Sequence, residues 1–169
     1  DIITAIERGF GLSPNAEITI EANPGTVNQF KFAQLRELNF NRLSLGMQSL
    51  DDEFLLKIGR AHTAAQALDA YESARRAGFA NISIDLIFAL PGQTLPHWAN
   101  TLDRAIKLNP EHISLYELSI EEGTRFAELR AQGALDLPDE DIQLEMYELA
   151  INKLKLAGFD HYEVSNFAM

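Results

Sequence analysis

The sequence of 169 residues contains no cysteine. This absence excludes disulfide bonds within the chain, and it excludes zinc or iron–sulfur sites whose ligands are thiolates of this chain. Long apolar runs are also missing, because no stretch approaches the roughly 20 apolar residues that cross a bilayer. No signal peptide is visible either, so the sequence predicts a cytoplasmic location.

Positive charge is scarce: 14 Lys and Arg stand against 25 Asp and Glu, which gives a formal net charge of −11. Such an acidic surface repels phosphate backbones, so nucleic acid is not an expected partner. The acidity also has a simpler interpretation, because many soluble cytoplasmic proteins carry it for solubility alone. The phosphate-binding motifs GxGxxG and GxxxxGK[ST] are missing too, which argues against a nucleotide-binding sheet.

One short pattern recurs along the chain. A helical segment ends at Gly, Asn or Pro, a short spacer follows, and an apolar–polar–apolar strand begins, in residues 38–45, 77–84, 108–115 and 157–164. Gly and Asn favour the left-handed conformation that closes a helix. A further strand is expected at 17–22, and the predicted helical stretches are a tail at the start and about 27–38, 52–77 with a break near Gly59, 96–108 and 139–157.

The alternation of strands and helices predicts a parallel sheet with right-handed crossovers. Strands of a doubly wound sheet read as continuous apolar runs, but these strands alternate. One face carries Ile18, Ile20, Leu43, Leu45, Met47, Ile82, Ile84, Leu86, Ile113, Leu115, Tyr162 and Val164. The other carries Thr19, Glu21, Asn23, Ser44, Gly46, Gln48, Ser83, Asp85, Ser114, Tyr116, Glu163 and Ser165. The pattern favours an α/β fold that is an incomplete (β/α) barrel of parallel strands, with helices outside and a polar lumen.

Three polar side chains on neighbouring strands stand out as a candidate ligand site, and we expect Glu21, Gln48 and Asp85 to lie at one level of the lumen. Buried carboxylates are unfavourable unless they are paired or hydrogen-bonded, and a ligand with ammonium and hydroxyl groups would satisfy them. Arg42, Arg60 or a water could do so instead. Arg60, at the helix break, could clamp a ligand carboxylate, or it could be an ordinary surface residue.

The remaining candidates favour structural roles. The four histidines form no HxH or HExxH pattern, so no metal site is predicted. His112 and His161 precede strands at the edge opposite the expected site, which favours surface or capping roles. Trp98 is expected in the core, and Asp139 is expected at the start of a helix.

Five segments together resemble one family: residues 20–26, 42–49, 58–62, 84–94 and 113–118. They look like the radical S-adenosylmethionine (SAM) proteins of the oxygen-independent coproporphyrinogen III oxidase family. The resemblance implies a partial radical SAM TIM-like barrel of six strands. It also implies that Glu21, Gln48, Arg60 and Asp85 contact SAM, with Ser119 as a weaker candidate at its backbone.

This family has two branches. One is the oxidase, which decarboxylates two propionates of coproporphyrinogen III in heme biosynthesis. The other is a heme chaperone, which binds heme and passes it to an acceptor protein. Residues 21–26, 116–124 and 162–168 look more like the chaperone branch, so the implied partners are SAM, a tetrapyrrole and a heme-accepting protein.

The sequence departs from the family at both ends. The family's cysteine motif for its [4Fe–4S] cluster follows the first strand, and no such motif is present. The C-terminal domain associated with heme or substrate is also missing. We therefore expect residues 1–169 to be the central part of a radical SAM barrel, with the cluster held only in the full-length parent. The chain alone is predicted to be inactive, because radical chemistry requires that cluster.

Overall fold

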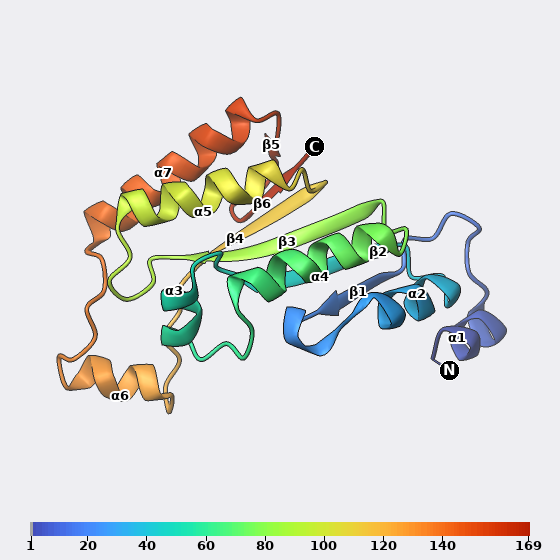
Figure 1. The fold of residues 1–169 in the computed structure, drawn as a ribbon, viewed down its shortest axis with the longest axis horizontal. Coiled ribbons are helices and arrows are strands. Elements are labelled where there is room, and N and C mark those ends of the chain that lie inside the picture. The colour runs from blue at the N-terminus through green and yellow to red at the C-terminus, as the bar shows by residue number, and fades with distance from the viewer. Residues whose placement is uncertain (1) are drawn as a thin grey trace.

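The computed structural model describes residues 2–169, which form an open six-stranded sheet in the order β1-β2-β3-β4-β6-β5 (Figure 1). The parallel strands are β1 (Thr19–Ala22), β2 (Arg42–Gln48), β3 (Asn81–Phe88) and β4 (His112–Glu117). Two short strands, β5 (Asp160–His161) and β6 (Asn166–Ala168), complete the sheet. Because the sheet does not close on itself, the expected incomplete barrel is confirmed.

The helices alternate with the parallel strands, and α4 and α5 run across one face of the sheet in Figure 1. α2 packs against α4, and α5 packs against α7. No helix within residues 2–169 has the length and apolar character needed to span a membrane. The helices are α1 (Ile2–Phe10), η1 (Pro24–Thr26), α2 (Gln29–Glu37), α3 (Asp52–Lys57), α4 (Ala64–Arg76), α5 (Leu95–Lys107), α6 (Arg125–Ala131) and α7 (Glu140–Leu156).

The repeated helix endings adopt the expected left-handed conformation. Asn39, Gly78, Asn109 and Gly158 have φ angles of 66°, 93°, 54° and 96°. At Gly78 the next amide, Phe79 N, donates to the carbonyl of Ala74 at 3.1 Å. This bond spans five residues and satisfies a carbonyl of the last helical turn. Each such ending turns the chain from a helix directly into the following strand.

The core lies between the helices and the apolar face of the sheet. It includes the alternating residues Leu43, Leu45, Ile82, Ile84, Ile113 and Leu115, all of which are buried. Removing such a side chain from water contributes about 1.5–3 kcal/mol. Trp98 is fully buried as expected, and its Nε1 donates to the carbonyl of Met146 at 2.9 Å. That bond joins α5 to α7 within the core.

The end of the chain differs from the expected parallel strand at 162–164. β6 instead pairs antiparallel with β4, and β5 pairs antiparallel with β6. Phe167 is the buried residue, whereas Tyr162 and Val164 are 60% and 71% exposed. The turn is held by the Glu163 side chain, which accepts a hydrogen bond from Ser165 N at 2.9 Å. A tight turn therefore sends Phe167 into the core, and period-two alternation could not reveal this reversal.

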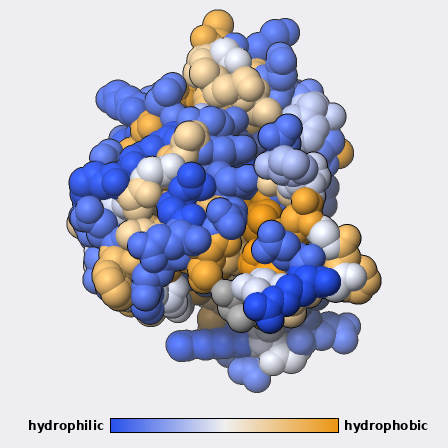
Figure 2. All heavy atoms as spheres, turned by 90° about the vertical axis from the view of Figure 1, so that its right-hand side faces the viewer, coloured by the Kyte–Doolittle hydropathy of each residue, from blue (hydrophilic) through white to orange (hydrophobic). Residues whose placement is uncertain are grey.

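Two helices lie outside the main layers. α6 was not expected, and none of its residues is buried. Thr124 caps it by accepting from Ala127 N at 3.3 Å. α1 confirms the expected helical tail and also has no buried residue. Figure 2 shows apolar patches among the hydrophilic side chains on the side of the molecule where α1 and α2 lie. Exposed apolar residues of α1 and α2 are Ile2, Ile6, Phe10 and Phe30.

Candidate functional site

The polar side chains of the four parallel strands line one pocket of about 460 Å³, which we call the lumen pocket. The predicted polar face is therefore confirmed for these strands. Glu21, Gln48 and Asp85 all belong to it. The pocket is lined by Thr19, Glu21, Arg42, Ser44, Gln48, Ser83, Asp85, His112, Ser114, Tyr116, Tyr162 and Asn166.

The strand register shows that the three candidate residues are staggered along the lumen pocket. Glu21 is paired with Ser44, which is paired with Ser83. Asp85 lies two residues further along β3, and Gln48 is paired with Leu86 after a register shift in β2. The expectation of a single level was therefore wrong. The residues instead rise toward the carboxyl ends of the strands, where ligand sites of such folds lie.

Asp85 is the carboxylate that the protein partly removes from water. Ser44 Oγ lies 3.2 Å from Asp85 Oδ1 and 3.1 Å from Oδ2, so its hydroxyl can donate to this carboxylate. Burial raises the pKa of Asp85 above its usual range, although hydrogen bonds from Ser44 and Ser114 act in the opposite direction. The nearby charge of Glu21 also raises this pKa. A cation bound beside Asp85 would relieve both effects.

Glu21 differs from the buried carboxylate that we expected. β1 is an edge strand, and Glu21 is exposed. Its side chain has no hydrogen-bond or ion-pair partner among residues 2–169. The burial argument therefore applies to Asp85, while Glu21 is an accessible acceptor at the open side of the lumen pocket.

Gln48 is 9% exposed and has a left-handed backbone with a φ of 64°. Its side chain folds over Gly46, where a Cβ atom would lie 2.7 Å from Gln48 Nε2 and 3.2 Å from Asn23 Oδ1. Asn23 Oδ1 in turn accepts a hydrogen bond from Arg60 Nη1 at 3.3 Å. The structure thus connects Arg60 to the Gln48 end of the site, although Arg60 does not line the lumen pocket itself.

Ser119 lies apart from the other candidates. It is exposed and lines a second cavity of about 690 Å³, together with residues of α3 and α6. Pro91, Gly92 and Glu121 also line this cavity. The structure therefore brings together Glu21, Gln48 and Asp85 with Arg60 beside them, but it does not bring Ser119 into the lumen pocket.

The amino-terminal end of the lumen pocket contains a hydrogen-bonded chain that the sequence analysis missed. His112 is buried, with Nδ1 2.8 Å from Ser83 Oγ and Nε2 2.8 Å from Tyr162 OH. Burial lowers the pKa of His112, and the charge of Arg42 acts in the same direction. The surface role expected for His112 was wrong. The sequence did contain a signal for this position. His112, Ser114 and Tyr116 are spaced two residues apart, so they lie on the same face of the strand.

The donor groups of residues 2–169 do not form a metal site. Within residues 2–169 no three His, Cys, Asp or Glu side chains are grouped as metal ligands. The lumen pocket instead offers carboxylates, an amide and hydroxyls. These groups accept hydrogen bonds from ammonium and hydroxyl groups of an organic ligand.

The sequence is similar to those of a heme chaperone and of a radical S-adenosyl methionine domain-containing protein. The heme chaperone HemW of Bacillus subtilis is 43% identical over 153 residues, which cover 90% of this chain and 40% of that protein. The mitochondrial radical S-adenosyl methionine domain-containing protein 1 of Bos taurus is 39% identical over 167 residues, 99% of this chain and 38% of that protein. The chain thus spans about two fifths of the length of these curated relatives.

A solved structure supports the same assignment. Coproporphyrinogen III oxidase HemN from Escherichia coli, a radical SAM enzyme, superimposes with a TM-score of 0.85 and 29% identity. The match covers 99% of this chain and 38% of that one. A family model described as the radical SAM superfamily matches residues 1–105, which is more than half of the chain. The chain therefore belongs to the radical SAM superfamily.

Proposed function

We propose that residues 1–169 are the SAM-binding part of a longer radical SAM protein that acts on a tetrapyrrole, as a heme chaperone. The observation that carries this proposal is the lumen pocket, with Asp85 and Gln48 partly or fully withdrawn from water. It occurs in a chain whose curated relatives named as heme chaperones are 36–43% identical.

The residues of the lumen pocket fit SAM chemically. SAM carries an ammonium group, a carboxylate and two ribose hydroxyls. Asp85 and Glu21 can accept hydrogen bonds from the ammonium and hydroxyl groups, and the Gln48 amide can donate and accept. Arg60 is the candidate partner of the carboxylate, because a guanidinium can bind it with two parallel hydrogen bonds. The space kept free over Gly46 allows Gln48 to adopt its position.

The iron–sulfur cluster does not fit residues 1–169. Its thiolate ligands require cysteine, and the sequence has none. We therefore propose that the cluster cysteines lie in another part of the full-length protein. When bound there, the cluster and SAM together would supply the radical chemistry typical of the family. The role of the present residues would be to bind and orient SAM.

The proposal also includes the tetrapyrrole that the full-length protein binds and the protein to which it passes this tetrapyrrole. The relatives named as heme chaperones are more similar in sequence than HemN, at 36–43% against 29% identity. This difference favours heme as the ligand and a heme-accepting protein as the partner. The alternative is an oxygen-independent coproporphyrinogen III oxidase, which HemN represents. The cytoplasmic location stays a prediction, since the bovine relative is named as mitochondrial.

The two functions can be separated in the full-length protein with its cluster reconstituted under anaerobic conditions. Incubation with coproporphyrinogen III, SAM and a reductant should yield no decarboxylated product. Incubation with heme should yield a stable complex that loses its heme to an acceptor apoprotein. Decarboxylated product at a rate comparable to that of HemN would overturn the chaperone assignment.

The SAM site is tested separately by calorimetric titration of SAM into the same protein. Asp85→Ala and Glu21→Ala should each weaken binding, the former by about 10-fold or more, since a hydrogen bond to a charged group contributes about 1.5–3 kcal/mol. Glu117→Ala, at the end of β4 and outside the lumen pocket, is the control and should bind normally. Unchanged affinity in both site variants would refute the assignment.

A further inference from the structure

The segment between α3 and α4, residues 58–63, bridges the ends of two strands at the candidate site. Arg60 reaches the end of β1 through its bond to Asn23. His62 reaches the end of β2, because its Nε2 lies 3.2 Å from the carbonyl oxygen of Met47. The segment is itself fixed at its far end, where Thr63 and Gln66 form a capping box at the start of α4. It can therefore act as a rigid support.

The backbone that His62 contacts is an unusual turn centred on Gln48. Ser49 N donates to the carbonyl of Met47 at 2.8 Å, and the residue between them, Gln48, has a φ of 64°. A bond across one residue with positive φ defines the rare and strained form of the γ-turn. Backbone strain of this kind persists only where the surroundings hold it.

His62 is well placed to hold this turn. It is 4% exposed, and its Cβ would lie 3.6 Å from a Cβ added at Gly25, so it packs closely against η1. A carbonyl oxygen can only accept, so the ring nitrogen Nε2 must carry the hydrogen. The Met47 carbonyl therefore receives two hydrogen bonds, one from within the turn and one from His62.

From this geometry we infer that His62 is a positioning residue for the ligand site. It fixes the Met47 carbonyl, the carbonyl fixes the γ-turn, and the turn presents the Gln48 amide to the lumen pocket. This inference rests on the proposed function, because it takes SAM as the ligand that Gln48 contacts. A residue that merely filled the core would stabilise the fold without acting through Gln48.

The test uses two substitutions of His62 in the full-length, cluster-reconstituted protein. His62→Leu keeps an apolar side chain of similar bulk and removes the donor, while His62→Gln retains a side-chain N–H. We expect His62→Leu to weaken SAM binding by about 5- to 10-fold in calorimetry, because the energies of residues in one hydrogen-bonded network are coupled. His62→Gln should restore the affinity to within about 3-fold of the wild type.

Repeating His62→Leu in a Gln48→Ala background shows whether the effect passes through Gln48. We expect no further loss of affinity in that double variant, because the group that His62 positions is already absent. An equal loss in both backgrounds would overturn the inference. So would an unchanged affinity in His62→Leu while Gln48→Ala weakens binding; in that case the SAM site itself would stand. If neither Gln48→Ala nor Asp85→Ala weakens binding, the proposed function fails first.

A measurement on the wild-type protein keeps the inference testable if His62→Leu does not fold. The ¹⁵N chemical shifts of the His62 ring distinguish its two neutral tautomers. We expect the hydrogen on Nε2, both with and without SAM. A hydrogen on Nδ1 alone would remove the bond to Met47 and would overturn the inference.

Discussion

Two polar regions at opposite ends of the parallel strands differ in how completely their groups are paired. At the amino-terminal end, the Arg75 guanidinium contacts Tyr71 OH, the Glu111 carboxylate and the carbonyls of Phe79, Ala80 and Asn109. Toward the carboxyl-terminal end, the hydrogen-bond partners of the Asp85 carboxylate within residues 2–169 are serine hydroxyls alone. The comparison indicates that the first region holds the fold together and the second is prepared for a ligand.

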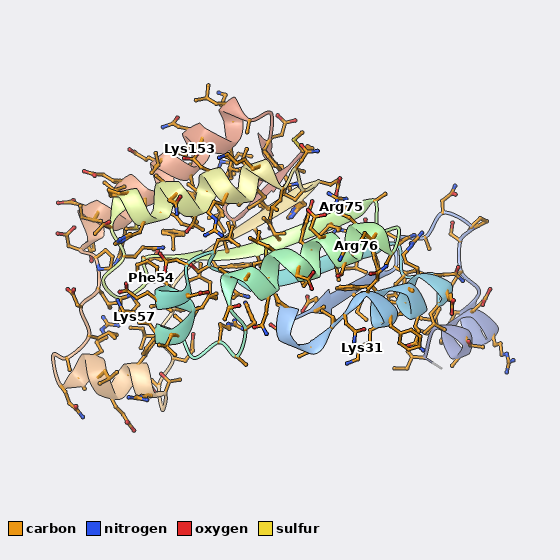
Figure 3. The ribbon with its side chains drawn as sticks, viewed as in Figure 1. Lys31, Phe54, Lys57, Arg75, Arg76 and Lys153 are labelled. Atoms are coloured by element: carbon orange, nitrogen blue, oxygen red, sulfur yellow. The ribbon has the colours of Figure 1, made fainter. Side chains whose placement is uncertain are left out.

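The Arg75 region joins one helix to two strands. Figure 3 shows Arg75 near the end of α4, next to Arg76. Glu111 accepts from Ile82 N at 2.8 Å, and Tyr71 OH donates to the carbonyl of Leu108 at 2.9 Å. Every partner of Arg75 is thus itself part of a link between α4 and the starts of β3 and β4. This complete pairing leaves no group to serve a ligand.

The site region shows the opposite balance. Gln48 adopts a strained φ, and burial raises the pKa of Asp85. Such features reduce stability when no ligand is present. They are typical of functional sites, where strain and unpaired groups are kept because a ligand uses them.

The largest expected effect is at the paired end. Arg75→Ala should lower the free energy of unfolding by about 3 kcal/mol, because it leaves Glu111 and several carbonyls without their partner. Urea denaturation of the full-length protein measures this change. Arg76→Ala is the matched control, since Arg76 is half-exposed and meets Asp69 at 3.6 Å. It should change stability by less than about 0.5 kcal/mol. Equal effects at both positions would show that the paired Arg75 region does not hold the fold together.

Asp85→Asn should stabilise the protein without SAM, in contrast to Arg75→Ala. Burial raises the folded-state pKa of Asp85, so its protonated form contributes stability that is complete below the unfolded pKa and is lost as the pH rises through the folded pKa. We expect the variant to unfold roughly 2–4 °C higher at pH 7. At pH 3 the two proteins should unfold together. A lower melting temperature at pH 7 would show that Asp85 is structural.

Gly46→Ala tests whether the space beneath Gln48 matters for the ligand. The new Cβ would lie 2.7 Å from Gln48 Nε2 and 3.2 Å from Asn23 Oδ1, and both of these side chains can move. The third neighbour, the Ala22 carbonyl oxygen at 3.8 Å, is at an ordinary contact distance. We therefore expect little change in stability but a loss of SAM affinity of about 3- to 5-fold in calorimetry, or about 1 kcal/mol. Gly25→Ala is the control, because its Cβ would make only an ordinary contact at 3.6 Å. Similar affinities for both variants would argue against a role for the Gln48 amide.

The smallest expected effect concerns His112 at the amino-terminal end of the lumen pocket. Its folded-state pKa is lowered by burial, so its stabilising contribution is present above the unfolded pKa of about 6.5 and is lost as the pH falls. His112→Gln should therefore reduce the loss of unfolding free energy between pH 7 and pH 5, by less than about 1 kcal/mol. An unaltered pH dependence would mean that His112 does not titrate in this range.

The sequence was sufficient for the parallel part of the fold. Period-two alternation separated the buried face from the lumen face in β2, β3 and β4, and Gly or Asn marked four helix endings. The prediction of a parallel strand was wrong at residues 160–168. The antiparallel reversal there depends on the hydrogen bond to the Glu163 side chain and on the burial of Phe167 in the core. The sequence analysis also missed α6, a helix of 7 residues of which none is buried.

For the site, the sequence predicted which side chains share a face of the sheet. It did not predict their positions along the lumen pocket or how far each is buried. The position of Gln48 along the lumen pocket depends on a register shift in β2, and the exposure of Glu21 depends on β1 being an edge strand of the sheet. The bond between His62 and Met47 joins residues 15 positions apart in sequence, and only the folded chain brings them together. Such long-range contacts have no periodic signal in a single sequence.

Binding of SAM at the carboxyl-terminal end of the lumen pocket is tested by substituting one residue at each end of this pocket, Asp85 and His112. Calorimetric titration of the full-length, cluster-reconstituted protein should show a loss of about 10-fold or more for Asp85→Asn. His112→Gln should remain within about 2-fold of the wild type. Equal affinities for the two variants, or a larger loss for His112→Gln, would contradict the claim that the carboxyl-terminal end of the lumen pocket binds SAM.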